Sequence, residues 1–165
     1  MNSFFLKNKK GFTLVELLIV IVIIMLIAVF VYLSLFRRKG FSELYSTRDQ
    51  IVALLREAQN NAISQNKDSE WGVYFSNLTS TSSFYSLFYG TTYSTSTSLK
   101  KYNLPTSVQY NTSTIPTGSS LTIYFNKITG IPSTSTSIIL NFNLSNQTIA
   151  SSTININQSG LISFN

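Results

Sequence analysis

The stretch KKGFTLVELLIV, residues 9–20, decides how this chain of 165 residues is built. It opens a run from residue 12 to residue 36 in which every side chain is apolar or small except those of Thr13, Glu16, Tyr32 and Ser34. An α-helix rises about 1.5 Å per residue, so about 20 residues cross a hydrocarbon core roughly 30 Å thick. Residues 17–36 alone meet that length, and the run is therefore predicted to be a membrane-spanning helix.

Glu16 is the one charged residue of this run. An ionised carboxylate inside hydrocarbon is expensive, so it needs either a partner or a position at the membrane edge. The nearest cations along the chain are Lys9 and Lys10, and Lys10 lies six residues back, off the helical i,i+4 face. Glu16 is thus either a residue whose side chain reaches the interface or a residue with a more specific partner.

Residues 11–16, GFTLVE, closely resemble the processing site of type IV pilins and type II secretion pseudopilins. In that family a prepilin peptidase in the membrane cuts after a glycine that ends a short basic leader. The new N-terminal residue, usually phenylalanine, is then N-methylated. The resemblance implies cleavage after Gly11, methylation of Phe12 and an assembly role for Glu16, which takes the fifth mature position. The basic residues of the implied leader are Lys7, Lys9 and Lys10.

The implied cleavage gives a physical reason for the carboxylate. Cutting after Gly11 creates a cationic amine on Phe12, and Glu16 of a neighbouring pilin or pseudopilin subunit can neutralise it during assembly. Three cations flank each side of the helix, so the positive-inside rule does not set its orientation. The resemblance sets it instead: a single pass in the inner membrane, with the leader in the cytoplasm and the C-terminal domain outside, and later a place in a filament.

A secretory signal peptide is the main competing interpretation of the apolar run. Such a signal has an apolar region of about 7–15 residues followed by a small-residue cleavage site. Here the run is longer, and the basic residues 37–39, RRK, follow it. The run should therefore stay with the mature protein, and the basic residues should flank the membrane.

The composition leaves little material for catalysis. The chain has no cysteine and no histidine, and all six carboxylate side chains lie at or before Glu70. From residue 71 to residue 165 the charged side chains are Lys100, Lys101 and Lys127. A carboxylate-pair hydrolase, a histidine-based triad and a histidine or cysteine zinc site therefore cannot be built there, and calcium sites normally need carboxylates too. We expect no enzyme, no cofactor and no metal site.

Residues 41–66 return to helical spacing. One apolar face is formed by Leu44, Ile51, Leu55, Ala58 and Ala62. Because no proline occurs before residue 105, one long helix is predicted, apolar all round in its first half and amphipathic in its second. We expect it to end near residues 66–68, and Gly40 could break or bend it.

The remainder is predicted to form antiparallel strands, because apolar residues alternate with polar ones along much of it. The predicted strands are residues 71–75, 84–89, 107–110, 121–125, 140–144, 154–157 and 161–164. The Ser/Thr-rich runs between them are expected to be exposed loops, at residues 79–83, 91–98 and 133–137.

Together these elements predict an α+β, pilin-like fold, in which a long N-terminal helix packs on a C-terminal antiparallel β-sheet domain. The expected divisions are a prepilin leader, a transmembrane and assembly helix, an amphipathic continuation of that helix, and a β domain with Ser/Thr-rich loops, at residues 1–11, 12–39, 40–68 and 69–165 respectively.

Three further segments resemble the H-type minor pseudopilins, a branch of the same family. They are the helical residues 48–66, residues 124–132, which resemble an F-x-x-x-G strand, and residues 154–162, which resemble a terminal I-x-x-S-G strand. This resemblance implies a β-sandwich-like domain on the helix and a minor subunit that acts at or near a filament tip.

Two other functions stay open. The chain could be a DNA-uptake pilin, with Lys100, Lys101 and Lys127 supplying cations and nearby tyrosines supplying stacking. Three lysines are few for that task, so nucleic acid is not the expected partner. The chain could also be a single-span surface adhesin that never polymerises, but this would leave Glu16 unexplained.

Overall fold

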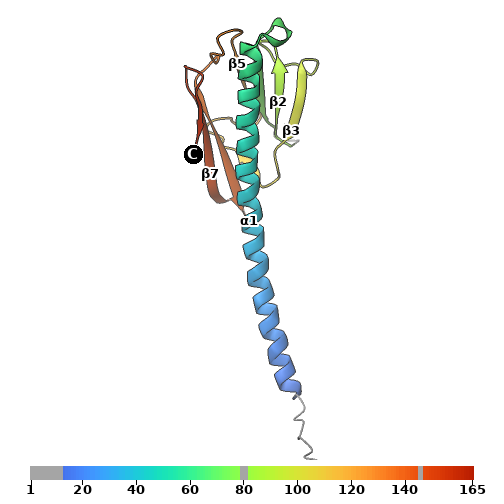
Figure 1. Cartoon of the computed structure of the whole chain (residues 1–165). Coiled ribbons are helices and arrows are strands. Elements are labelled where there is room, and N and C mark those ends of the chain that lie inside the picture. Colours follow the sequence, from blue (N-terminus) through green and yellow to red (C-terminus); the bar gives the residue numbers. More distant parts are fainter. Residues whose placement is uncertain (1–12, 79–81, 145–146) are drawn as a thin grey trace, which may run out of the picture. The chain divides into compact units, whose positions relative to one another are not determined.

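The computed structural model describes residues 13–78, 82–144 and 147–165, and its chain divides into two compact units, residues 1–38 and Lys39–Asn165. One helix, α1 (Leu14–Ile63), belongs to both units (Figure 1). This confirms the single long helix. In the second unit the predicted apolar face of α1 is fully buried, with no exposed surface on Leu44, Ile51, Leu55, Ala58 or Ala62.

Eight strands form two four-stranded antiparallel sheets in the second unit. The first sheet has the order β3-β2-β1-β5, from β1 (Trp71–Asn77), β2 (Phe84–Tyr89), β3 (Ser98–Asn103) and β5 (Ser119–Phe125). The second has the order β4-β6-β7-β8, from β4 (Val108–Tyr110), β6 (Thr136–Leu144), β7 (Gln147–Ile156) and β8 (Ile162–Phe164). The α+β, pilin-like arrangement is therefore confirmed.

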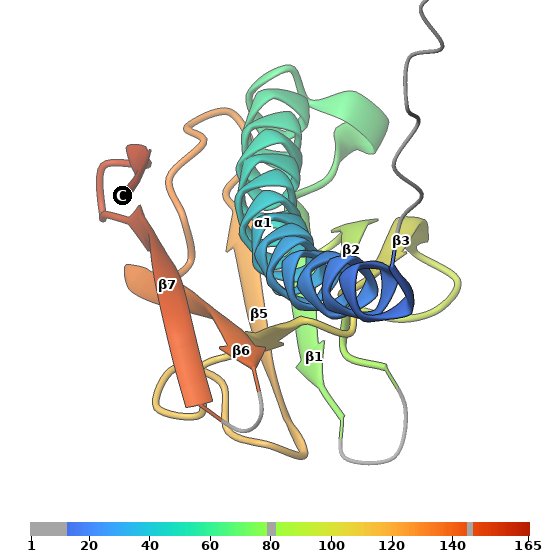
Figure 2. The ribbon, with the colours of Figure 1, turned by 90° about the horizontal axis from the view of Figure 1, so that it is seen from below.

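Both sheets bury their apolar residues against the same helix. Figure 2 shows α1 passing over β5, with β6 and β7 to one side and β1, β2 and β3 to the other. Alternate residues of the strands point inward, as the period of two requires. The shared core includes Val73, Phe75 and Ile123 of the first sheet and Leu140, Phe142 and Ile154 of the second.

The strand β3 was not predicted, because it is an edge strand without alternating apolar residues. Leu99, Lys100 and Lys101 along it are all exposed. The strands β6 and β7 begin at Thr136 and Gln147, earlier than expected, because their pairing runs from Thr136–Ile156 to Leu144–Gln147 and includes polar residues that carry no alternating pattern. The run at residues 133–137 is therefore only partly a loop, and residues 79–81 lie outside the described residues.

The C-terminal end of α1 also differs from the prediction. The α-helix stops at Ile63, and a short 3-10 helix, η1 (Asn66–Asp68), follows it. Gln65 between them takes a left-handed conformation with φ of 55°. That conformation cannot continue a right-handed helix, so the chain turns here toward β1.

Gly40 does not break α1, which was one of the two possibilities that the sequence left open. The helix continues through it, and the residue is buried against the second sheet. A Cβ atom at this position would lie 2.1 Å from Cε2 of Phe142. The missing side chain therefore lets the Phe142 ring pack directly on the helix backbone.

Replacing Gly40 with alanine is expected to destabilise the fold by about 1–3 kcal/mol, because the Phe142 ring must move out of a filled core. The better helix propensity of alanine offsets only about 1 kcal/mol of this. A second change, Phe142→Leu, should recover part of the loss. Urea unfolding of the single and double variants checks this, with Ser42→Ala on the exposed side of α1 as control. A single variant as stable as the native chain would show that the contact is not tight.

Gln59 of α1 connects the turns of both sheets to the helix. Its Nε2 atom donates to the carbonyl oxygens of Gly130 and Gly160, each at 3.0 Å. Both glycines have positive φ, 64° and 83°, and a Cβ on Gly130 would lie 2.7 Å from the Ile63 side chain. These are the glycines of the two strand segments that resemble H-type pseudopilins. Their position is explained by the close approach to the helix.

Candidate functional site

The first part of α1, Leu14–Tyr32, is long and apolar enough to cross a membrane. None of it is buried within the chain: its large apolar side chains are between 45% and 79% exposed, from Val20 and Ile21 at the low end to Leu14 at the high end. An apolar surface of this size needs a cover of lipid or of other helices. The segment can therefore anchor the chain and offer a packing surface to neighbours.

Glu16 lies in the first turn of this helix, directly behind a cap. The Glu16 backbone N–H donates to Oγ1 of Thr13 at 3.2 Å, and the Leu17 N–H donates to the Thr13 carbonyl oxygen at 3.2 Å. Thr13 is thus the N-cap and Glu16 the third helical residue, in the T-x-x-E order of a capping box. The role of Thr13 was not predicted, although the T-x-x-E spacing is visible in the sequence.

Its position in the first helical turn gives Glu16 a possible structural role at the start of α1. A carboxylate near a helix N-terminus is stabilised by the helix dipole by about 0.3–1 kcal/mol. In the part of the chain that the structure describes, Glu16 makes no ion pair. The predicted cleavage residues Gly11 and Phe12, like the leader lysines, lie outside the described residues. Their roles remain predictions.

The three lysines considered for nucleic-acid binding do not form one patch. Lys100 and Lys101 are neighbours on β3 and therefore point to opposite faces of the sheet. Lys100 Nζ contacts both carboxylate oxygens of Glu57, at 2.6 and 2.8 Å, and this hydrogen bond is the main reason that the pKa of Lys100 is raised. Lys127 is ion-paired with Asp68 near the end of α1. Two of the three cations are thus already neutralised within the chain.

Lys101 faces an aromatic cluster on the outer side of the first sheet. Its Nζ atom lies 3.9 Å from the centroid of the Phe84 ring. Tyr93, from the loop after β2, stacks on Tyr74 with centroids 4.0 Å apart and meets Phe88 edge-on at 5.8 Å. Because Tyr93 covers the Tyr74 ring face, a nucleic-acid base could not stack there without displacing this loop.

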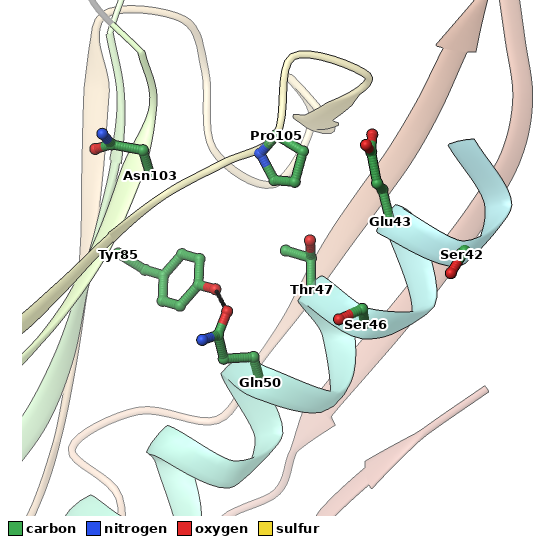
Figure 3. A pocket seen from close by; sticks show the side chains of 8 residues that line it. All are labelled: Ser42, Glu43, Ser46, Thr47, Gln50, Tyr85, Asn103 and Pro105. Atoms are coloured by element: carbon green, nitrogen blue, oxygen red, sulfur yellow. Dashed lines mark hydrogen bonds between the residues drawn. The ribbon is translucent and has the colours of Figure 1, made fainter. Parts of the chain in front are cut away.

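One pocket of about 240 Å³ lies between α1 and the first sheet (Figure 3). It is lined by Ser42, Glu43, Ser46, Thr47, Gln50, Tyr85, Asn103 and Pro105. Glu43 accepts a hydrogen bond from Ser107 Oγ, and the Tyr85 hydroxyl donates to Oε1 of Gln50 at 2.5 Å. The pocket thus offers one carboxylate with no second acid beside it. No cluster of three metal-ligating residues occurs in residues 13–78, 82–144 and 147–165.

Burial changes the ionisation of two tyrosines, Tyr85 at the pocket and Tyr110 on β4. Burial, and next the nearby Tyr102, raises the pKa of Tyr85 from 10.0 to about 12. Burial also raises the pKa of Tyr110 well above its ordinary value.

Above pH 10 the unfolded chain releases the protons of Tyr85 and Tyr110 while the folded chain keeps them, so the stability of the fold should decrease as the pH rises. A denaturation series at pH 9–12 checks this, and Tyr85→Phe should flatten the fall. A native chain equally stable across this range would contradict the prediction.

A known protein family matches the N-terminal part of the chain. The family model of the prokaryotic N-terminal methylation motif matches residues 6–32, a segment that contains both Thr13 and Glu16. No curated protein and no solved structure matches the chain significantly. The motif is typical of type IV pilins and pseudopilins, and it implies processing by a prepilin peptidase and assembly with other pilin subunits. The match ends at residue 32 and does not reach the segments that resemble H-type pseudopilins.

Proposed function

We propose that this chain is a structural subunit of a type IV pilus or a type II secretion pseudopilus. Its precursor is cut after Gly11, Phe12 is methylated, and the mature chain assembles through α1. The observation that carries this proposal is the methylation motif over residues 6–32, which coincides with an apolar helix exposed on all sides. The minor role near a filament tip rests on the resemblance to H-type pseudopilins alone.

In this proposal Glu16 pairs with the Phe12 amine of a neighbouring subunit. The carboxylate stands in the first helical turn, two residues after the start of α1, and has no intramolecular ion pair among the described residues. A buried charge without a partner is costly, and pairing between subunits removes that cost only in the assembled filament. The pair therefore makes assembly depend on prior cleavage.

The proposal is tested by producing the chain in a host that carries a prepilin peptidase and the assembly proteins. Filaments that bind an antibody against this chain support it. A processed chain that stays dispersed in the membrane would favour the non-polymerising adhesin instead. The DNA-uptake alternative requires salt-dependent DNA binding by the purified chain, which the internal pairing of Lys100 and Lys127 disfavours.

A further inference from the structure

The pocket between α1 and the first sheet contains a buried hydroxyl group without a partner. Thr47 lines this pocket and is only 4% exposed. Within residues 13–78, 82–144 and 147–165 its hydroxyl takes part in no hydrogen bond, and it points away from α1 toward Pro105 (Figure 3). A hydroxyl that is removed from water without a partner is costly. The pocket therefore holds a donor and acceptor that a ligand can satisfy.

The side chains before and after Thr47 extend this polar row. Glu43, Thr47 and Gln50 follow one another at i, i+4 and i+7, so they lie on one face of α1. The Glu43 Oε2 atom accepts from Ser107, and Gln50 accepts from the Tyr85 hydroxyl through Oε1. Among the described residues the amide N–H groups of Gln50 have no partner. The row thus presents a carboxylate oxygen, a hydroxyl and an amide donor.

Charge narrows the class of ligand. Glu43 is the charged residue among those that line the pocket, so a phosphate or carboxylate group would be repelled. Lys39 Nζ lies 3.7 Å from Glu43 Oε1 and already offsets part of the negative charge, which reduces the gain from binding a cation. A neutral ligand whose groups both donate and accept hydrogen bonds fits best.

The size and the second wall of the pocket narrow the class further. A volume of about 240 Å³ holds about eight water molecules at roughly 30 Å³ each. Tyr85 and Pro105 face the helix row from the other side and add the C–H surface of their rings (Figure 3). Tyr102 stacks on Tyr85 at 5.6 Å between centroids and holds that ring in place. A small ring with hydroxyls on its rim and C–H groups on its faces matches this mixture of polar and apolar lining.

We propose that this pocket binds one neutral sugar ring, with Thr47 at its base. A ring hydroxyl can donate to Glu43 Oε1 while its neighbour donates to Thr47 and accepts from the Gln50 amide. None of these residues belongs to the apolar part of α1 or to the predicted cleavage site. The site therefore gives the chain a ligand whether or not the chain assembles into filaments.

The test is ligand-detected NMR on the full chain, purified in a zwitterionic detergent without a sugar headgroup. The probes are the methyl glycosides of glucose, galactose and mannose, with glucosamine and glucuronate as charged comparisons. At least one neutral glycoside should bind with a dissociation constant of about 1–10 mM, and glucuronate should not bind.

Two variants locate the binding. Thr47→Val keeps the shape of the side chain but removes the hydroxyl, so it should weaken binding at least about tenfold. Thr91→Val is the matched control, because it removes an exposed hydroxyl from the loop after β2, outside the pocket. It should leave binding unchanged.

Urea unfolding separates a lost ligand contact from a damaged fold. Because the Thr47 hydroxyl is buried without a partner, Thr47→Val should unfold at the same urea concentration as the native chain or at a higher one. A lower midpoint would show that the hydroxyl has a partner in the fold, which would overturn the inference.

Three binding results would also overturn it. The first is no binding of any neutral glycoside up to about 50 mM. The second is equal binding by the native chain and by Thr47→Val, which would place the sugar elsewhere. The third is tighter binding of glucosamine than of the glucose glycoside, which would show that the Glu43 carboxylate selects a cation.

Discussion

Replacing Glu16 with glutamine is expected to abolish filament assembly while leaving cleavage and membrane insertion intact. Glutamine keeps the size of the side chain and still fits the T-x-x-E/Q capping box, so the start of α1 should be preserved. What is lost is the negative charge. Removing one partner of a buried ion pair costs about 3–5 kcal/mol, which is at least a hundredfold in each subunit contact.

The alternative role of Glu16, stabilising the helix start, predicts a much smaller effect. A carboxylate near a helix N-terminus contributes only about 0.3–1 kcal/mol. Thr13→Ala is the matched control, because it removes the hydrogen bond to the Glu16 N–H at a cost of about 1 kcal/mol and leaves the charge in place. Electron microscopy of filaments, normalised to processed chain in the membrane, checks both variants. Equal defects in the two would show that Glu16 acts through the helix start.

Replacing Gln59 with leucine is expected to lower the stability of the second unit by about 2–6 kcal/mol. The change removes the donor for two carbonyl oxygens, those of Gly130 and Gly160, and each polar group left without a partner costs about 1–3 kcal/mol. That is a large share of the roughly 5–15 kcal/mol that holds a typical domain together. Both sheets should loosen from α1, because each loses its turn contact with the helix.

Asn60→Leu is the matched control, since the neighbouring residue is exposed and should tolerate the change within about 0.5 kcal/mol. Gln59→Glu adds a pH test. At neutral pH its carboxylate would face two carbonyl oxygens, which raises the pKa of the new side chain in the folded state. Protonation restores one donor, so this variant should recover stability as the pH falls toward 4. Denaturant unfolding of the purified chain measures all three, and a Gln59→Leu variant as stable as Asn60→Leu would contradict the account.

The helix was predictable from the sequence almost to its end, because the members of its apolar face recur at intervals of seven, four, three and four residues and each of them is buried. Strands β1, β2 and β5 were predictable because each contains a short run rich in aromatic and aliphatic residues. Edge strand β3 was not, because its exposed residues 99–101 follow no alternating pattern. The start of β7 was hidden because its position is set by pairing with β6 and not by its own apolar residues.

The candidate site was predictable only where its signal is local in the sequence. Glu16 stands out as one charge in an apolar run, and the cap at Thr13 three residues earlier carried a visible signal too. The ion pairs of the lysines could not be predicted, because their partners are distant in sequence. Glu57 lies 43 residues from Lys100, and Asp68 lies 59 residues from Lys127. The double hydrogen bond of Gln59 spans 71 and 101 residues and left no local pattern to find.

The central claim is that the chain matures by cleavage after Gly11, and the most direct measurement is its N-terminus. Intact-mass and N-terminal peptide spectrometry should be made on the chain purified from membranes of a host that carries a prepilin peptidase. The account predicts a mature chain that begins at N-methylated Phe12. A chain that still begins at Met1 would contradict it, and a β domain held by a simple membrane anchor would then be the better description.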